Sequence, residues 1–190
     1  MANLPKDYQL RLGKMGDRYL LINFLTRTYE EFFPEQKNLC HLADTVRQFF
    51  CLDTPLWIVE GQQTAIACLW MGSAVDQVTG DRYGHIFLIY VDPQHRRQGI
   101  ASALIDRAKD WAKSRGQTRI GLQVFINNDN ALNLYQNLGF QTRSLLMLKN
   151  IYGLRQKVFL GGRGCGVQCK VYGFSELQCV NLLVIMEKLP

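Results

Sequence analysis

Apolar residues recur with both strand and helix spacing in the first part of the chain. Apolar and polar side chains alternate over residues 8–12, which predicts a strand. Residues 20–32 carry apolar side chains three and four positions apart, which predicts an amphipathic helix that Asp17 can cap and that ends before Pro34. A second helix is expected over residues 41–50.

Strand signals dominate the segment that follows. Two apolar runs over residues 56–60 and 64–71 flank a Gly-Gln-Gln turn, which predicts a hairpin. Residues 76–84 are polar and contain two glycines, so a loop is expected there. The continuous apolar run over residues 86–91 is typical of a central strand that is buried on both faces.

The strongest helical pattern comes next. Residues 101–112 carry apolar side chains at helical spacing with charged residues between them, and Gly116 closes the predicted helix. A strand is expected over residues 120–126, a short helix over residues 131–138, and one or two final strands over residues 140–149. Because strands and helices alternate, the expected fold class is α/β, or α+β, with a mixed sheet and helices on both faces.

The character of the sequence changes after residue 149. Glycines crowd together between residues 161 and 166, and no clear hydrophobic period follows. We therefore expect one domain over residues 1–149 and a C-terminal extension over residues 150–190. The extension can add a strand, cover an acceptor site, form a homodimer contact or be loosely ordered, and its sequence does not choose among these alternatives.

Composition limits the class of protein. Hydrophobic residues make up 47% and charged residues 20% of the 190 residues, values that are typical of a globular domain. The first ten residues lack the apolar stretch of a signal peptide, and no apolar run reaches the roughly 18 residues that span a bilayer. We therefore expect a cytoplasmic protein without a membrane segment.

Six cysteines are present, but neither disulfides nor a metal site is expected. Cys40, Cys51 and Cys68 are scattered among apolar residues and resemble small buried side chains. Cys165 and Cys169 have no histidine nearby and no second pair downstream, so they do not match the usual spacing of zinc ligands.

The net charge of the chain is +6, which a solvated basic surface explains as well as an anionic partner does. An anionic partner would be a phosphorylated cofactor or a nucleic acid. The sequence contains neither a basic stripe interleaved with aromatic residues nor a helix-turn-helix signal, so no nucleic-acid partner is expected.

A basic turn separates the buried run at residues 86–91 from the strongest predicted helix. The first N–H groups of a helix lack partners and carry partial positive charge, so a strand that delivers the chain there can form a pyrophosphate site. Gly99 lets the main chain approach an oxygen closely, and Arg96 and Arg97 add positive charge. Neither a G-x-G-x-x-G fingerprint nor a P-loop is present, and a turn that binds nothing remains an alternative.

Two motifs here resemble those of the GNAT superfamily of N-acetyltransferases. The family's cofactor motif, Arg/Gln-x-x-Gly-x-Gly/Ala, is similar to Arg96-x-x-Gly99-x-Ala101. A second family pattern, Asn-x-x-Ala-x-x-x-Tyr-x-x-x-Gly-Phe, lies downstream. Its counterparts are Asn127, Asn128, Asn130, Ala131, Tyr135, Gly139 and Phe140. The resemblance covers residues 86–149, whereas residues 1–85 match only in the predicted order of elements.

The resemblance implies a fold, an activity and a cofactor. In the family, a mixed and mostly antiparallel sheet contains two central parallel strands that splay apart, and acetyl-CoA lies in the splay. Those strands correspond here to residues 86–91 and 120–126. The chain is thus expected to be an acyltransferase that moves an acetyl group from acetyl-CoA to a primary amine on a peptide N-terminus, a lysine or a small molecule. A regulatory module that binds CoA without catalysis is the alternative.

The resemblance also implies roles for individual residues. The pantetheine arm is expected to pair with the main chain near Tyr90 and Val91, and the pyrophosphate to lie on consecutive N–H groups of the basic turn. These belong to Arg96, Arg97, Gln98, Gly99, Ile100 and Ala101. Asn130 is expected to bond to the pantetheine or to the following chain, and Tyr135 to donate a proton to the departing sulfur.

The general base is not apparent from the sequence. In the protein N-terminal acetyltransferase branch of the family, a glutamate often occupies the position that aligns with Gln123, and a glutamine cannot take a proton. Candidates that can act through water are His85, His95, Glu30 and Glu31. An α-amino group, with a pKa of about 8, needs less help from a base than a lysine, with a pKa of about 10.4.

Overall fold

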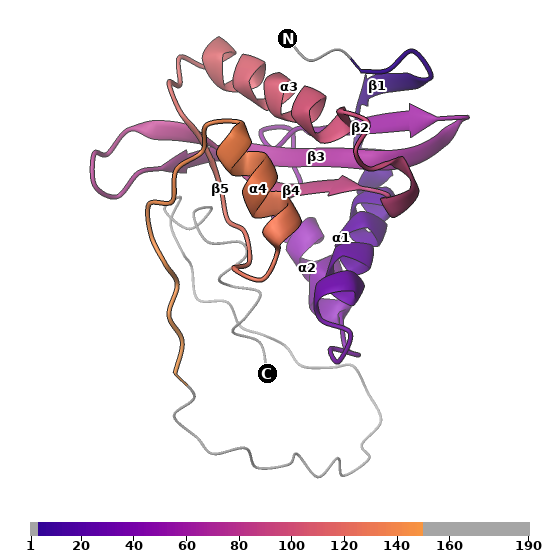
Figure 1. Cartoon of the computed structure of the whole chain (residues 1–190), viewed down its shortest axis with the longest axis horizontal. Helices are drawn as coiled ribbons and strands as arrows, with labels where there is room; N and C mark the ends of the chain where they lie inside the picture. The colour runs from indigo at the N-terminus through magenta and orange to yellow at the C-terminus, as the bar shows by residue number, and fades with distance from the viewer. Residues whose placement is uncertain (1–3, 150–190) are drawn as a thin grey trace.

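The computed structural model describes residues 4–149, and its elements follow the order expected from the sequence (Figure 1). The strands are β1 (Tyr8–Leu12), β2 (Leu56–Gly61), β3 (Thr64–Val75), β4 (Arg82–Val91) and β5 (Ile120–Leu122). The helices are α1 (Arg18–Phe32), α2 (Cys40–Phe49), α3 (Ile100–Ser114) and α4 (Asp129–Asn137), with short 3-10 turns η1 (Met15–Asp17) and η2 (Pro93–His95). The extension expected over residues 150–190 lies outside the described residues.

The five strands form one sheet in the order β1-β2-β3-β4-β5. The pairs β1–β2, β2–β3 and β3–β4 are antiparallel, whereas the pair β4–β5 is parallel. The predicted hairpin is confirmed, because β2 and β3 join through Gln62 and Gln63, whose positive φ values of 50° and 64° suit a tight hairpin turn. The mixed and mostly antiparallel sheet expected from the sequence is therefore present.

The predictions for residues 82–84 and 140–149 are wrong. Residues 82–84 belong to β4 and not to a loop, because Arg82 pairs with Val75 and extends the β3–β4 ladder. Within the described part of the chain, residues 140–149 form no strand, although their apolar character predicted one. A strand requires a ladder of hydrogen bonds with a neighbour, which an apolar pattern cannot supply by itself.

The start of α1 also differs in detail from the prediction. Asp17 occupies the position before the helix, but its carboxylate makes no capping hydrogen bond to α1. The carboxylate instead accepts bonds of 2.8 and 3.0 Å from Arg11 on β1 and one of 2.7 Å from the Lys14 N–H. Asp17 therefore ties the entry of α1 to the edge strand of the sheet.

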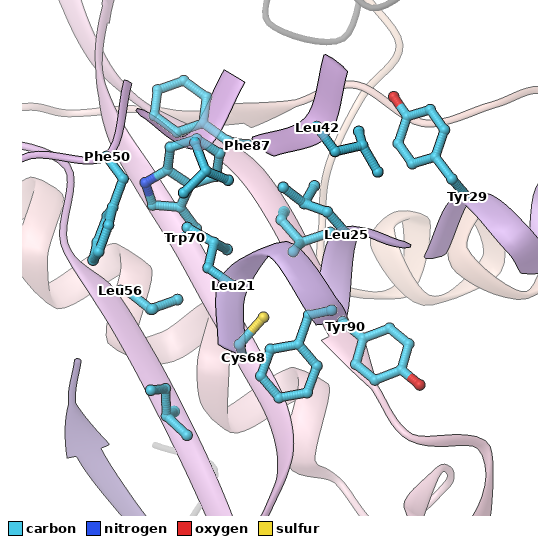
Figure 2. Packing of buried hydrophobic residues seen from close by; sticks show 14 residues of the cluster. Leu21, Leu25, Tyr29, Leu42, Phe50, Leu56, Cys68, Trp70, Phe87 and Tyr90 are labelled. Carbon is cyan, nitrogen blue, oxygen red and sulfur yellow. The ribbon is translucent and has the colours of Figure 1, made fainter. Parts of the chain in front are cut away.

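Helices cover both faces of the sheet, as the sequence predicts, and each face has its own apolar core. On the face covered by α1 and α2, Trp70 packs between Phe50 and Phe87, with ring centroids 6.4 and 5.0 Å away (Figure 2). Helices α3 and α4 cover the other face. Side chains along β2 alternate between the two cores, as the pleat requires, and β3 also contributes to both, so the central strands are buried on both faces.

The register between β3 and β4 contains one irregularity. Trp70 and Met71 are consecutive on β3, but their partners on β4 are Leu88 and Ile86, so Phe87 is an extra residue on β4. A bulge of this kind bends its strand and increases the twist. Ile86 is also the last residue of β4 that pairs with β5. The bulge therefore coincides with the point where the two parallel strands diverge.

Strand β5 ends at Leu122, so the strand expected over residues 120–126 is shorter than predicted. Strand β4 continues to Val91 without β5 beside it. The splay implied by the family resemblance is thus present, and one edge of β4 faces the gap.

Candidate active site

A cavity of about 90 Å³ lies where β4 and β5 diverge. Its walls come from α1, β4, the residues after β5, and α4. They are Leu25, Thr28, Tyr29, Phe32, Ile86, Phe87, Leu88, Ile89, Leu122, Gln123, Val124, Phe125, Asn128 and Tyr135. None of these lining residues carries a carboxylate or an imidazole. Because α1 and α4 cover opposite faces of the sheet, the cavity passes through the splay.

Tyr135, the predicted acid, lines this cavity from α4. Gly139 follows the helix with a φ of 85°, and the chain turns back so that the Phe140 N–H donates to the Tyr135 carbonyl at 2.9 Å. The Phe140 ring then packs edge-on against the Tyr135 ring, with centroids 5.6 Å apart. The Gly-Phe pair of the sequence motif thus holds the tyrosine ring in place.

The hydroxyl of Tyr135 is suited to donate a proton. Burial raises the pKa of Tyr135 to about 12, so the hydroxyl remains protonated at neutral pH. Within residues 4–149 the hydroxyl has no hydrogen-bond partner. It is therefore free to donate to a group bound in the cavity.

The asparagine at the cavity is Asn128, whereas the sequence analysis assigned a role to Asn130. Asn128 lines the cavity, and its Oδ1 accepts a 3.1 Å bond from the Ala131 N–H, which caps α4. Asn130 is the second residue of α4 and is exposed. Motif spacing could have identified Asn128, because it stands three residues before Ala131, as the family pattern requires.

The edge of β4 that faces the gap can take a further strand. The Asp92 N–H donates to the Ile66 carbonyl of β3 at 2.8 Å, so the main chain of Asp92 faces β3. The N–H and C=O groups of successive residues point to opposite sides of a strand. Those of Tyr90 therefore also point toward β3, whereas the N–H and C=O groups of Val91 and Ile89 point toward the gap. An extended ligand would therefore pair with Ile89 and Val91. The sequence analysis did not name Ile89 as a pairing residue. Residues two positions apart on a strand present their main chain to the same edge, so Val91 would have indicated Ile89.

The turn after β4 presents main-chain N–H groups without partners. Gly99 has a φ of 81°, and open space surrounds the position where a Cβ would stand. The first hydrogen bond of α3 runs from the Ala103 N–H to the Gly99 carbonyl at 3.0 Å. Within residues 4–149, no acceptor bonds to the N–H groups of Gly99, Ile100 or Ala101. With the helix dipole, these groups form a site for phosphate oxygens.

The side chains of this turn differ in their contacts. The Arg96 guanidinium donates two bonds of 2.7 Å to the Glu31 carboxylate. Gln98 Oε1 accepts a 2.8 Å bond from the Tyr8 hydroxyl, which holds the amide toward β1. Arg97 is exposed, has a φ of 61° and makes no ion pair with any residue from 4 to 149. Arg97 is therefore the arginine whose charge is available to a phosphate.

None of the four base candidates lines the cavity. His85 is buried in β4, and burial lowers its pKa to about 4. Glu31 is paired with a guanidinium, whose hydrogen bond lowers the pKa of the carboxylate. His95 bonds to a tyrosine of β1 at 2.8 Å, and Glu30 is exposed on α1. Gln123 does line the cavity, at the position where the family often has a glutamate.

Other classes of site find no counterpart in the described region. None of its helices has the length and apolar character needed to span a membrane. No group of three His, Cys, Asp or Glu side chains gathers between residues 4 and 149 as a metal ion would require. Cys68 is buried as expected, but the expectation is wrong for Cys40 and Cys51, which are exposed; all three are free thiols. Cys165 and Cys169 lie outside the described residues.

An open strand edge next to unpartnered N–H groups at a helix start suits an extended ligand that carries phosphate. Residues 21–140 match the acetyltransferase (GNAT) family, and the chain belongs to that family. Acetyltransferases of this family use acetyl-CoA, the cofactor expected from the sequence. The free β4 edge, the unpartnered N–H groups and the open space at Gly99 fit this molecule.

Several named N-acetyltransferases are similar to this chain in sequence. N-alpha-acetyltransferase of Sulfurisphaera tokodaii is 27% identical over 161 residues, which cover 84% of this chain and 94% of that protein. N-acetyltransferase 8F1 of Rattus norvegicus is 27% identical over 117 residues, which cover 60% of this chain and 53% of that protein. In the related N-acetyltransferase 8 proteins the chain likewise spans about half of the relative's length or less.

Solved structures show the same fold. Ribosomal-protein-alanine N-acetyltransferase from Brucella melitensis biovar Abortus 2308 superposes with a TM-score of 0.59 at 19% identity, covering 75% of this chain and 98% of that one. An aminoglycoside N-acetyltransferase in complex with CoA gives a TM-score of 0.60 at 18% identity, and the match covers 75% of this chain and 93% of that one. At these identities, the likeness concerns the fold alone.

Proposed function

We propose that this chain is an acetyl-CoA-dependent N-acetyltransferase that acts on the α-amino group of a peptide, by direct transfer between two bound substrates. The observation that carries the proposal is the Tyr135 hydroxyl, which is buried, protonated and without a partner among the described residues, in the cavity between β4 and β5. This cavity adjoins the free edge of β4, along which an extended acyl carrier can pair.

The residues that hold acetyl-CoA follow from the geometry of this edge. Ile89 and Val91 pair with the amides of the pantetheine arm, and Asn128 bonds to the arm from the opposite wall of the splay. The diphosphate lies on consecutive N–H groups at the start of α3, from Gly99 to Ala101. Arg97 adds a positive charge at this anion site.

Tyr135 acts as the general acid of the reaction. As the amine nitrogen bonds to the acetyl carbon and the carbon–sulfur bond breaks, Tyr135 gives its proton to the sulfur. A thiol has a pKa of about 8.5, so donation from a hydroxyl with a pKa of about 12 is concerted with cleavage of the carbon–sulfur bond. Tyr135 regains its proton through water from the amine. An N–H group on the β4 edge polarises the carbonyl.

The cavity favours an acceptor that is partly neutral before it binds. No lining residue carries a carboxylate or an imidazole that could take the amine proton. At pH 7 about a tenth of α-amino groups are neutral, against less than about a thousandth of lysine side chains. A relative named an N-alpha-acetyltransferase supports the same class of acceptor.

Aromatic rings line the approach of the acceptor. Phe33, just past the end of α1, packs edge-on against Phe125, with centroids 4.8 Å apart. Phe32 lies 6.3 Å from the same ring and also lines the cavity. An acceptor that enters between α1 and the segment after β5 meets this apolar wall, which favours peptides that begin with a small uncharged residue.

Thiol release from acetyl-CoA tests this proposal. We expect release with peptides that begin with Ala or Ser, and none with the same peptides when the N-terminus is blocked and only an internal lysine is free. Release with the blocked peptides or with an aminoglycoside alone would contradict the proposed acceptor. Binding of acetyl-CoA without thiol release on any amine would instead support a regulatory CoA-binding module.

A further inference from the structure

Helix α1 contacts the cofactor turn through two ion pairs. Arg27 pairs with Asp92 at 3.2 Å, and Glu31 pairs with Arg96 at 2.7 Å. Arg27 and Glu31 are four residues apart, so they lie on one face of α1, one helical turn from each other. Helix α1 lies near the end of β4, where the chain turns toward α3 (Figure 1), and this face of α1 contacts that turn. The two pairs have opposite polarity along the same turn.

Besides its ion pair with Glu31, Arg96 contacts the strand that precedes the turn. Its Nε donates a 2.9 Å bond to the Val91 carbonyl, on the edge of β4 that faces the gap. The Nη1 and Nη2 atoms are both engaged by Glu31. The planar guanidinium thus joins α1 to the last residue of β4, with each of its three nitrogens in use. A lysine could not make these contacts together, since it has a single nitrogen.

Two faces of α1 contact different parts of the site. Its inner face supplies Thr28 and Phe32 to the cavity, and its outer face supplies Arg27 and Glu31 to the cofactor turn. A movement of the turn relative to α1 would therefore change the distance between the phosphate site and the cavity. Two ion pairs along one helix face resist that movement.

We propose that Arg96 and Glu31 are positioning residues for acetyl-CoA, which hold the N–H groups from Arg97 to Ala101 at a fixed distance from the cavity. Arg97, and not Arg96, is then the side chain that meets the phosphates. The Val91 carbonyl is occupied by Arg96, so pairing of the pantetheine with the β4 edge ends at the Val91 N–H. This inference rests on the proposed function, because it assigns the turn to the cofactor.

Calorimetric titration with acetyl-CoA separates the two arginines. We expect Glu31→Gln and Arg96→Gln each to raise the Kd for acetyl-CoA by roughly fivefold, the scale of one half-exposed, hydrogen-bonded ion pair. The double variant should bind no more weakly than either single variant, because both substitutions break the same pair. In the thiol-release assay, KM for acetyl-CoA should rise while kcat stays within about twofold.

Salt dependence identifies the side chain that meets the phosphates. Arg97→Gln should weaken binding and also flatten the dependence of Kd on salt, because it removes a charge that attracts the anion. The double variant Arg96→Gln, Glu31→Gln should weaken binding and leave that dependence unchanged, since removing both partners of the ion pair does not alter the net charge. If instead the double variant flattens the salt dependence and Arg97→Gln does not, the assignment of the two arginines is overturned.

The chain offers a matched control on the opposite edge of the sheet. Arg11 on β1 pairs with Glu60 on β2 at 2.6 Å, and both side chains are about as exposed as Arg96 and Glu31. Glu60→Gln should lower the stability to a similar extent without changing the Kd for acetyl-CoA. An equal Kd in Glu31→Gln and Glu60→Gln would overturn the positioning role.

Two further outcomes distinguish this inference from the proposed function. If Glu31→Gln lowers kcat strongly with an unchanged Kd, Glu31 acts in proton transfer and its positioning role is overturned. If the wild-type chain binds acetyl-CoA but releases no thiol with any amine, the proposed function fails. The calorimetric Kd values then still support or overturn the role of Arg96 and Glu31.

Discussion

Asn128 and Tyr135 are seven residues apart, and both line the cavity between the splayed strands. Asn128 stands just before α4 and Tyr135 lies within it, so this short helix brings both side chains to the cavity. Asn128 also caps the helix through the Ala131 N–H, which sets where α4 begins. Gly139 and Phe140 end the helix and hold the Tyr135 ring. The start and the end of this short helix therefore determine the position of the proposed acid.

Replacing Tyr135 by phenylalanine tests its role as an acid. The ring packing against Phe140 is kept, and only the hydroxyl is lost. We expect kcat to fall by roughly a hundredfold, the lower end of the contribution of a general acid, with KM for acetyl-CoA almost unchanged. Tyr83→Phe is the control, because Tyr83 lies at the start of β4 and does not line the cavity. Equal kcat in wild type and Tyr135→Phe would disprove the assignment.

The pattern of apolar positions was sufficient to predict the elements that carry the site. The helical period over residues 101–112 predicted the start of α3 to within one residue. The motif spacing pointed to Tyr135, which lines the cavity at the splay. The bulge at Phe87 could not be predicted in this way. Residues 86–91 are all apolar, so no period is present that an extra residue could shift. The two-residue alternation becomes visible only when β3 provides the register.

Contacts between distant segments were also beyond the reach of the sequence. Glu31 and Arg96 are 65 positions apart, and no local pattern relates a carboxylate near the end of α1 to the cofactor turn. Arg96 and Arg97 were therefore equivalent candidates for the phosphate. The asparagines at positions 127, 128 and 130 differ in this respect, because motif spacing singles out Asn128, and the start of α4 then shows that its side chain caps the helix.

Gly99→Asp tests the phosphate site. The substitution adds a negative charge in the open space beside the unpartnered N–H groups at the start of α3. Repulsion between this carboxylate and a phosphate bound to the same N–H groups predicts a loss of acetyl-CoA affinity on the order of a hundredfold. Gly116→Asp, just past the other end of α3, is the matched control. Gly116 has a φ of 71° and Gly99 a φ of 81°, and both have open space where a Cβ would stand.

The two glycine variants separate strain from charge. Both place a side chain on a backbone that favours glycine, so thermal unfolding should show a similar loss of stability in each. Only Gly99→Asp should weaken binding in a calorimetric titration with acetyl-CoA. If both variants bind acetyl-CoA equally well, the diphosphate does not lie at this turn.

His85 predicts a loss of stability in mild acid. Burial lowers its pKa in the folded chain to about 4, from an ordinary value near 6.5. Below pH 6.5 the unfolded chain takes up a proton that the folded chain does not bind until about pH 4. The stability present above pH 6.5 is therefore lost as the pH falls toward 4, by about 2 kcal/mol between pH 7 and pH 5.

Urea unfolding at pH 7 and pH 5 measures this loss. In His85→Gln the difference between the two pH values should shrink, whatever the stability of the variant at pH 7. Part of the difference should remain, because burial also lowers the pKa of His41. An unchanged difference in the variant would show that His85 does not couple folding to protons in this range.

Gln123→Glu tests whether the cavity lacks a base. Gln123 lines the cavity, so a carboxylate there could take the proton of an ammonium group bound beside it. At pH 6.5 only a few per cent of α-amino groups are neutral, and the variant should raise kcat/KM by roughly tenfold. At pH 9 most α-amino groups are already neutral, so wild type and variant should have similar rates.

Gln123→Met separates the proton from the shape of the side chain. Methionine is close to glutamine in length and cannot take a proton, so its pH profile should match that of wild type. If Gln123→Glu and Gln123→Met change the rate equally at all pH values, the effect comes from packing in the cavity. If Gln123→Glu leaves the rate unchanged at pH 6.5, the wild-type chain already has a route for the amine proton.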